Sequence, residues 1–169
     1  QIYFITARCR DALPAFASEA AKAIFWDRFL HYAAAAAFEP WILSLLNNHY
    51  HVVGYCASGN RLGTMMQRVH GSGAKLVNDL LPARHLPFWR EHSNHTYFDG
   101  CLRNARQYER AYRYTQTQAV RAGIVRDWQE YPHTRIWVDL EAGLERALKL
   151  RAFLEGVPYR RYEEKSNPR

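Results

Sequence analysis

Cysteine is scarce in this sequence, and its spacing excludes two classes of small protein. The 169 residues contain three cysteines, Cys9, Cys56 and Cys101. They lack the paired spacing of a zinc knuckle and, being odd in number and far apart, do not form a disulfide framework. We therefore expect a reducing compartment and a packing role for these side chains. The default localisation is cytoplasmic.

Long apolar runs, repeats and linkers are also absent. No run approaches the roughly 20 apolar residues needed to cross a bilayer, so we expect a soluble protein without a membrane partner. Without a linker the chain is predicted to be one domain over residues 1–169, with a core over about 2–138 and a C-terminal helix and basic tail over 139–169. No signal or transit segment is visible. Because Gln1 lies directly inside a predicted strand, we expect residues to precede it.

The composition that is present favours a packed core and a polyanionic partner. Hydrophobic residues make up 48% of the chain and aromatic residues 14%. Lys and Arg number 23 against 16 acidic residues, which gives a formal net charge of +7. Because a basic surface attracts polyanions, nucleic acid is the leading candidate partner.

Hydrophobic periodicity predicts alternating strands and helices. Strands are expected over residues 2–7, 41–46, 49–55 and 95–98, and helices over 18–39, 61–80, 104–123 and 140–154. The Asn47-Asn48 turn joins the second and third strands into a hairpin, and residues 125–138 are expected to be irregular. This order predicts an α+β fold with one antiparallel sheet and helices packed on a face, a ferredoxin-like (RRM-like) arrangement.

Two histidines one residue apart interrupt the third predicted strand. Because side chains alternate along a strand, His49 and His51 lie on one face and Tyr50 lies on the other. Two imidazoles on one rigid face can approach a single metal ion, although a third ligand must come from elsewhere. The alternative is a half-exposed strand that carries two histidines without binding a metal.

The predicted helix over residues 104–123 separates into three stripes. The expected core face holds Tyr108, Ala111, Tyr112, Thr115, Ala119 and Ala122. Tyr114 and Gln118 lie one turn apart on the neighbouring stripe, and the next stripe outward carries Arg103, Arg106, Arg110 and Arg113. A phenol, a carboxamide oxygen and cations are what a site that attacks a phosphodiester requires. The alternative is a surface tyrosine beside solvated arginines that Glu109 partly neutralises.

In the order and spacing of these two motifs, the chain resembles the REP-associated tyrosine transposases, single-strand-DNA transposases of the HUH endonuclease superfamily. Asn48-His49-Tyr50-His51 stands where that family has Asn-His-hydrophobic-His, and residues 114–125, YTQTQAVRAGIV, closely follow its tyrosine helix. The chain departs from the family in having Asn47 for a proline and Gln118-Ala119 for Asn-Pro. Since Gln offers the same carboxamide oxygen as Asn, the ligand set is retained.

This resemblance implies a fold with an HUH hairpin strand and a tyrosine-bearing helix, and a metal-dependent chemistry. His49, His51 and Gln118 would bind Mg2+ or Mn2+, and Tyr114 would attack a phosphate to form a 5′-phosphotyrosine and a free 3′-hydroxyl. The sequence has no glycine-rich phosphate loop, as expected for strand exchange without ATP. Such an enzyme would act on the nucleoid within the cytoplasm.

The implied partner is single-stranded or hairpin DNA formed by a palindromic repeat. Candidate contacts to the DNA backbone are Arg84, Arg90, Arg103, Arg106, Arg110 and Arg113, with Arg160 and Arg161 in the tail. The alternative interpretation of each of these cations is a solvated charge that contacts no DNA. The target hairpin and the choice between monomer and homodimer stay open.

Two other functions compete with the transposase interpretation. A non-catalytic module on the same fold would stack single-stranded nucleic acid on sheet aromatics without a metal. A metal-dependent hydrolase that activates water would cleave without Tyr114. Among single residues, His92 and His95 are weaker alternative ligands, and Tyr97, Tyr108 and Tyr112 are weaker alternative nucleophiles.

Overall fold

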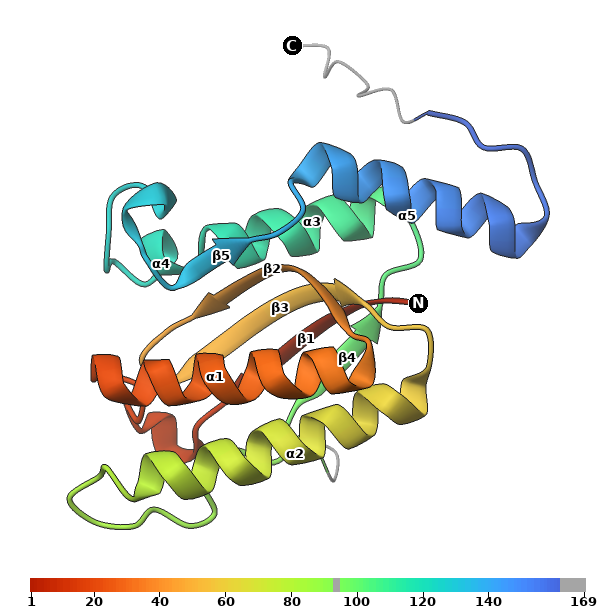
Figure 1. Cartoon of the computed structure of the whole chain (residues 1–169). Helices are drawn as coiled ribbons and strands as arrows, with labels where there is room; N and C mark the ends of the chain where they lie inside the picture. The colour runs from red at the N-terminus through yellow and green to blue at the C-terminus, as the bar shows by residue number, and fades with distance from the viewer. Residues whose placement is uncertain (93–94, 162–169) are drawn as a thin grey trace.

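A five-stranded antiparallel sheet forms the centre of the molecule (Figure 1). The computed structural model describes residues 1–92 and 95–161. The strands are β1 (Ile2–Arg8), β2 (Glu39–Leu45), β3 (His49–Tyr55), β4 (Phe98–Cys101) and β5 (Thr134–Ile136), in the spatial order β4-β1-β3-β2-β5. The first four follow the predicted ferredoxin-like order, and β5 extends the sheet beside β2.

Helices cover both faces of this sheet, which corrects the prediction of helices on one face. On one side lie α1 (Glu19–Ala36) and α2 (Gly59–Asn78). On the other side lie α3 (Ala105–Gln116), α4 (Gln118–Arg121) and α5 (Leu140–Glu155), with short 3-10 turns η1 (Arg10–Ala12) and η2 (Trp128–Glu130) in the connections. None of the described helices combines the length and apolarity needed to span a bilayer.

Local signals set most element boundaries. The Ser18 side chain accepts a hydrogen bond from the Ala21 N–H and begins α1, as predicted. That helix ends before Pro40, because Ala37 adopts a left-handed conformation with φ of 52°. Helix α2 continues through Gly71 and Gly73 without a break.

Three sequence predictions were wrong in detail. The strand expected over 95–98 lies at 98–101, and the segment expected to be irregular contains β5 and η2. The helix expected over 104–123 is interrupted at Thr117, where φ is −94° and ψ is 9°. That interruption separates the two residues of the predicted tyrosine motif into α3 and α4.

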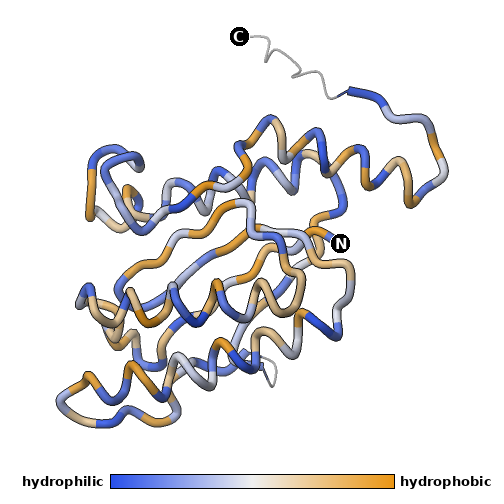
Figure 2. Tube along the Cα trace, in the orientation of Figure 1, coloured by the Kyte–Doolittle hydropathy of each residue, from blue (hydrophilic) through white to orange (hydrophobic). Residues whose placement is uncertain are grey.

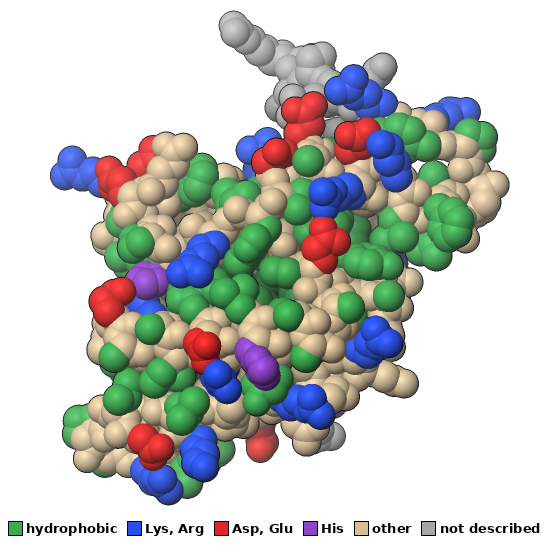
Figure 3. Space-filling model, viewed as in Figure 1, with side chains coloured by type: hydrophobic (Ala, Val, Ile, Leu, Met, Phe, Trp, Pro, Cys, Tyr) green, Lys and Arg blue, Asp and Glu red, His purple; other side chains and the backbone are tan. Residues whose placement is uncertain are grey.

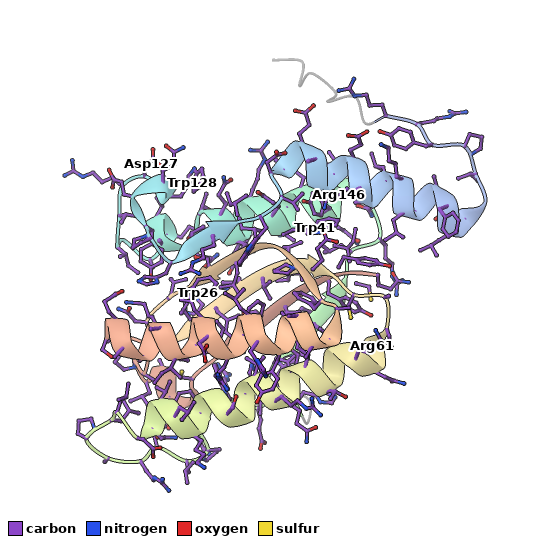
Figure 4. The ribbon with its side chains drawn as sticks, viewed as in Figure 1. Trp26, Trp41, Arg61, Asp127, Trp128 and Arg146 are labelled. Atoms are coloured by element: carbon purple, nitrogen blue, oxygen red, sulfur yellow. The ribbon has the colours of Figure 1, made fainter. Side chains whose placement is uncertain are left out.

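Alternation along the strands builds two separate cores. Orange stretches follow the strands in Figure 2, and each strand sends successive side chains to opposite faces. Tyr50 and Val52 of β3 join the core under α1 and α2, whereas Val53 joins the core under α3 and α5. Figure 4 shows Trp26 of α1 and Trp41 of β2 on opposite sides of the sheet. The sheet therefore has two buried faces of different composition.

Gly54 permits a close approach at the β2–β3 pairing. A Cβ atom there would lie 2.5 Å from the Phe38 ring and 2.6 Å from the Glu39 carbonyl oxygen. The register of β2 also shifts beside this point, between Pro40 and Ile42. The glycine thus keeps β3 straight where β2 bends, and β3 is the strand that carries the two histidines.

Candidate active site

The two histidines of β3 face the α3 side of the sheet, as their alternation predicted. In the strand register, His49 lies opposite Arg8 and His51 lies opposite Thr6 on β1, while Ser44 of β2 flanks His51 from the other side. Their ring centroids are 5.0 Å apart. The pairing therefore holds both imidazoles on the central strand of the sheet, which is hydrogen-bonded on both sides.

Asn48 fixes the orientation of His49. The Nδ1 atom of His49 lies 2.6 Å from Asn48 Oδ1, and the Asn48 Nδ2 donates to the Ala12 carbonyl at 3.2 Å. Because a carboxamide oxygen only accepts, the bond assigns the proton of neutral His49 to Nδ1. Its Nε2 lone pair is then available to a ligand.

His51 is buried between two aromatic rings without a hydrogen-bond partner. Its ring stacks on Phe4 with centroids 5.8 Å apart and meets the edge of Tyr114 at 5.1 Å. Both ring nitrogens are buried, and neither has a partner among the described residues. Burying unpaired polar atoms costs free energy, which makes His51 a candidate for binding a ligand.

The two imidazoles are neutral in this environment. Burial, followed by the neighbouring His49 and Arg8, lowers the pKa of His51 to about 3. Burial, followed by Arg8, also lowers the pKa of His49. Neutral imidazoles have the lone pairs that a cation needs, so binding would not require loss of a proton near neutral pH.

Side-chain bonds to the backbone accompany the helix break between Tyr114 and Gln118. The hydroxyls of Thr115 and Thr117 donate to the carbonyls four residues earlier, Ala111 and Arg113, each at 2.9 Å. Such bonds bend helices. The Gln118 Nε2 also donates to the Tyr114 carbonyl at 2.9 Å, which ties the end of α3 to the start of α4.

Gln118 is the third polar group beside the histidine pair. Its side chain is buried and lies close enough to raise the pKa of both imidazoles, although it completes no hydrogen bond to either nitrogen of His51. Since its Nε2 is committed to Tyr114, the carboxamide oxygen is the atom left for another partner. The described residues contain no group of three His, Cys, Asp or Glu that could hold a metal. Gln118 is therefore the candidate for a third donor beside the two histidines.

Tyr114 lies at the open side of this group. Its side chain is 38% exposed, and its hydroxyl has no hydrogen-bond partner among the described residues. The Arg121 guanidinium lies over its ring, 5.2 Å from the centroid. A solvent-accessible phenol beside buried imidazoles and a cation has the components of a phosphodiester-attacking centre.

The other tyrosines predicted as weaker nucleophiles lie in different surroundings. Tyr112 donates its hydroxyl to the Val138 carbonyl, and burial raises the pKa of Tyr108 and Tyr112. Burial also raises the pKa of the Tyr97 phenol. Of the core face predicted for this helix, Ala122 is exposed, because the break at Thr117 turns the chain away from the sheet.

The six predicted DNA-contacting arginines are distributed over the molecule. Arg84 and Arg113 form ion pairs with Asp79 and Glu109. Arg106 and Arg110 lie on α3 and Arg103 lies just before it, with Arg110 one helical turn from Tyr114, whereas Arg90 donates its backbone N–H to the Arg8 carbonyl. In the view of Figure 3, basic and acidic side chains alternate without forming one basic patch.

The remaining minor candidates also lie away from the histidine pair. His92 and His95 pair with each other through their backbones ahead of β4. Arg161 forms an ion pair with Glu141 on α5, and Arg160 lies in the same segment. The basic tail beyond Arg161 lies outside the described residues.

Sequence reasoning did not place Arg8 and Arg121 among the site residues. Arg8 reaches the site through the β1–β3 register, which no local pattern displays. Arg121 follows Gln118 by three positions on α4, and its helical spacing from Tyr114 was the available signal. Together they place two exposed cations beside the histidine pair and Tyr114.

Comparison with known proteins relates this arrangement to transposases at the level of the fold. No family model and no curated protein sequence matches the chain. Among solved structures, a REP-associated tyrosine transposase bound to a REP hairpin is similar over 79% of this chain and 74% of its own, with a TM-score of 0.64 and 14% identity. A "putative transposase" from Deinococcus radiodurans R1 is similar over 73% of this chain and 85% of its own, with a TM-score of 0.49 and 13% identity. The α+β fold that the two motifs predicted is thereby confirmed.

Proposed function

We propose that this protein is a single-strand-DNA transposase that nicks DNA and transfers the strand through Tyr114. One observation carries the proposal: an exposed phenol meets a buried imidazole whose two nitrogens are unpaired, at ring centroids 5.1 Å apart. The shared fold with a REP-associated tyrosine transposase supports it. A plain structural histidine would instead be expected to have its nitrogens satisfied.

The residues present fit a divalent cation. His49 and His51 would offer imidazole nitrogens and Gln118 a carboxamide oxygen, a donor set that suits Mn2+ and that Mg2+ accepts less readily because it prefers oxygen. When bound, the cation supplies Lewis-acid stabilisation of charge on a non-bridging phosphate oxygen. Asn48 orients His49 through the 2.6 Å bond at Nδ1.

The chain's own groups perform the transfer step. The Tyr114 oxygen attacks phosphorus, a P–O bond to tyrosine forms, and the P–O bond to the 3′ oxygen breaks. The phenol proton is released and the departing 3′ oxygen takes up a proton, so the products are a 5′-phosphotyrosine and a 3′-hydroxyl. Arg121, which lies over the Tyr114 ring, would pair with the negative charge of the phosphate. Because one phosphoester replaces another, the step is reversible without ATP.

The proposed partner is single-stranded DNA with a hairpin. The transposase of similar fold was solved with a REP hairpin, and the +7 charge of this chain suits a polyanion. Arg8, Arg90 and Arg121 are exposed cations beside the site and would contact the scissile region. Arg106 and Arg110 have no acidic partner among the described residues and would contact DNA farther along α3.

The test is a covalent-adduct assay. The protein is incubated in Mn2+ with labelled hairpin oligonucleotides that carry randomised single-stranded flanks, and the products are separated on a denaturing gel. We expect a protein–DNA band that disappears with EDTA and with Tyr114→Phe, a loss of at least about 1,000-fold. Tyr112→Phe is the matched control on the same helix and keeps the band.

Other outcomes would support the competing functions. Cleavage that persists in Tyr114→Phe without an attached band would identify a hydrolase that activates water. Binding that is unaffected by EDTA, with neither cleavage nor an adduct from any flank, would identify a non-catalytic nucleic-acid module. Either result contradicts the proposed tyrosine chemistry.

A further inference from the structure

A groove at the free end of β1 adjoins the candidate active site. It encloses about 260 Å³ between the end of β1, residues 90–92 and the start of β4. Its lining includes Thr6, Arg8, Arg90, His92 and Phe98. Arg8 belongs to both places, because it lines this groove and also lowers the pKa of His49 and His51. The groove therefore adjoins the histidine pair through Arg8, which lies opposite His49 in the strand register.

Cross-strand pairing aligns the groove with His51. Phe98 lies opposite Thr6, and Thr6 lies opposite His51, so the three side chains form one row on the same face of the sheet. Neighbouring strands are about 4.8 Å apart, which places Phe98 about 10 Å from His51 along this row. That separation corresponds to the reach of one or two nucleotides in an extended single strand.

The row is open at the Phe98 end. Helix α3 packs over β2 and β3. The helical cover of this face of the sheet therefore ends before Phe98. Phe98 is 42% exposed. Its ring lies 3.5 Å from the position that a Cβ at Gly100 would occupy, and the edge of His92 meets it at 5.5 Å. The Phe98 ring therefore lies along β4 over Gly100 and is partly open to solvent.

The positive charges at the groove suit a nucleotide, whose base is linked to a phosphate. Arg8 and Arg90 are exposed and have no acidic partner among the described residues, and the Arg90 N–H bonds the Arg8 carbonyl at 2.8 Å, which holds the two side by side. Glu91 is the acidic residue in the lining. A volume of about 260 Å³ is below the range of drug-sized ligands but accommodates one flat ring.

We propose that this groove binds one unpaired nucleobase next to the scissile phosphate, with the base stacked on Phe98 and its phosphates held by Arg8 and Arg90. The proposal rests on the proposed function, because it names the DNA that would lead into that site. Stacking on an aromatic ring is tolerant of sequence, so the groove orients the strand without selecting a particular base. Glu91 opposes phosphate binding, so Glu91→Gln is expected to tighten it.

Binding without catalysis tests the proposal. Fluorescence anisotropy in EDTA compares a short labelled oligothymidylate with the same sugar-phosphate chain lacking bases. We expect Phe98→Leu to weaken binding of the oligothymidylate roughly 5- to 30-fold and to leave the abasic chain unchanged, since stacking contributes about 1–2 kcal/mol per base. Phe98→Tyr retains binding, and Phe153→Leu, at an 82% exposed ring on α5, is the matched control.

Two outcomes overturn the proposal. Phe98→Leu could bind both ligands as the parent does, or it could weaken both equally, which would indicate altered folding or charge instead of stacking. The adduct assay separates this failure from failure of the proposed function. If Phe98→Leu binds normally while Tyr114 still forms the adduct, the subsite is wrong and the transposase chemistry stands. If base-dependent binding is lost in a chain that never forms an adduct, the subsite stands alone.

Discussion

The two faces of the sheet differ in how their buried histidines are hydrogen-bonded. Under α1 and α2, the Tyr50 hydroxyl lies 2.8 Å from His70 Nε2, and His70 Nδ1 lies 2.6 Å from the Thr96 hydroxyl. Both nitrogens of this buried imidazole are satisfied. On the α3 side, both nitrogens of His51 are buried and unpaired. Tyr50, which bonds His70, and His51 are adjacent residues of β3, so one strand connects the two imidazoles.

This difference distinguishes buried groups that stabilise the fold from buried groups that are left for a ligand. A fully paired network rigidifies a core, whereas unpaired buried groups reduce stability and persist where a ligand is to be bound. Because alternation along β3 sends Tyr50 to one face and His51 to the other, the satisfied network anchors the same strand that presents the unsatisfied site. The paired face thus holds the other face in its binding geometry.

Acid should destabilise the metal-free protein, because each face of the sheet buries a histidine that takes up a proton on unfolding. This is the largest effect that we predict. Burial lowers the pKa of His70 and of His51 to about 3, against an ordinary value of 6.5. Between these values the unfolded chain binds protons that the folded chain does not, so stability is complete above pH 6.5 and falls as the pH decreases. Two protons correspond to about 2.7 kcal/mol per pH unit.

Urea unfolding in EDTA between pH 5 and 6.5 measures this slope. His70→Gln should lower the slope by about one proton, whatever its effect on stability at neutral pH. The range avoids the carboxylates with lowered pKa, Glu19 and Glu145, which titrate below it. An unchanged slope in His70→Gln would show that His70 takes up its proton in the folded state.

Strand alternation explains why much of the fold and part of the site were predictable. A period of two assigned His49 and His51 to one face, and helical spacing put Tyr114 and Gln118 on one stripe. Both depend on neighbours in sequence. The structure brings these four residues together, and their chemical roles stay predictions.

The errors have two physical origins. The break at Thr117 coincides with side-chain bonds from Thr115, Thr117 and Gln118 to carbonyls four residues earlier, in a segment whose apolar spacing still predicts one helix. The other errors depend on pairing between strands. Strand β5 spans three residues and is defined by its pairing with β2, and the contribution of Arg8 depends on strand register. No local sequence pattern displays either pairing.

Replacing His51 by an apolar residue should stabilise the protein while removing its activity. His51→Leu removes two unpaired buried nitrogens at similar volume, so we expect the metal-free protein to gain about 1 kcal/mol and a melting temperature higher by about 2–4 °C. The adduct should be lost. Thermal melts in EDTA and the adduct gel measure the two effects.

His49→Leu is the matched control, because His49 makes the 2.6 Å bond to Asn48 that His51 lacks. We expect this variant to lose the adduct and to be no more stable than the parent. If His51→Leu proves less stable than the parent in EDTA, the imidazole nitrogens are satisfied in solution and the contrast between the two faces is lost.

A smaller predicted effect compares two tyrosine hydroxyls on the α3 face of the sheet. The Tyr108 hydroxyl is buried without a partner in the described part of the chain, whereas the Tyr112 hydroxyl donates to the Val138 carbonyl at 2.9 Å. Tyr108→Phe should therefore be neutral or stabilising by up to about 0.5 kcal/mol, and Tyr112→Phe should cost about 1 kcal/mol. Urea unfolding of both variants measures the difference.

Gly143 explains why the Tyr108 hydroxyl fits without a partner. A Cβ atom at Gly143 would lie 1.8 Å from that oxygen and 2.8 Å from the ring carbon that bears it. Gly143→Ala should thus destabilise the protein by about 1–3 kcal/mol through overpacking. In Tyr108→Phe the nearer clash disappears, so the same alanine should cost less, and the double-mutant cycle should give a favourable coupling. Equal costs in the two backgrounds would mean that the helices separate there instead, and that the oxygen is not confined by α5.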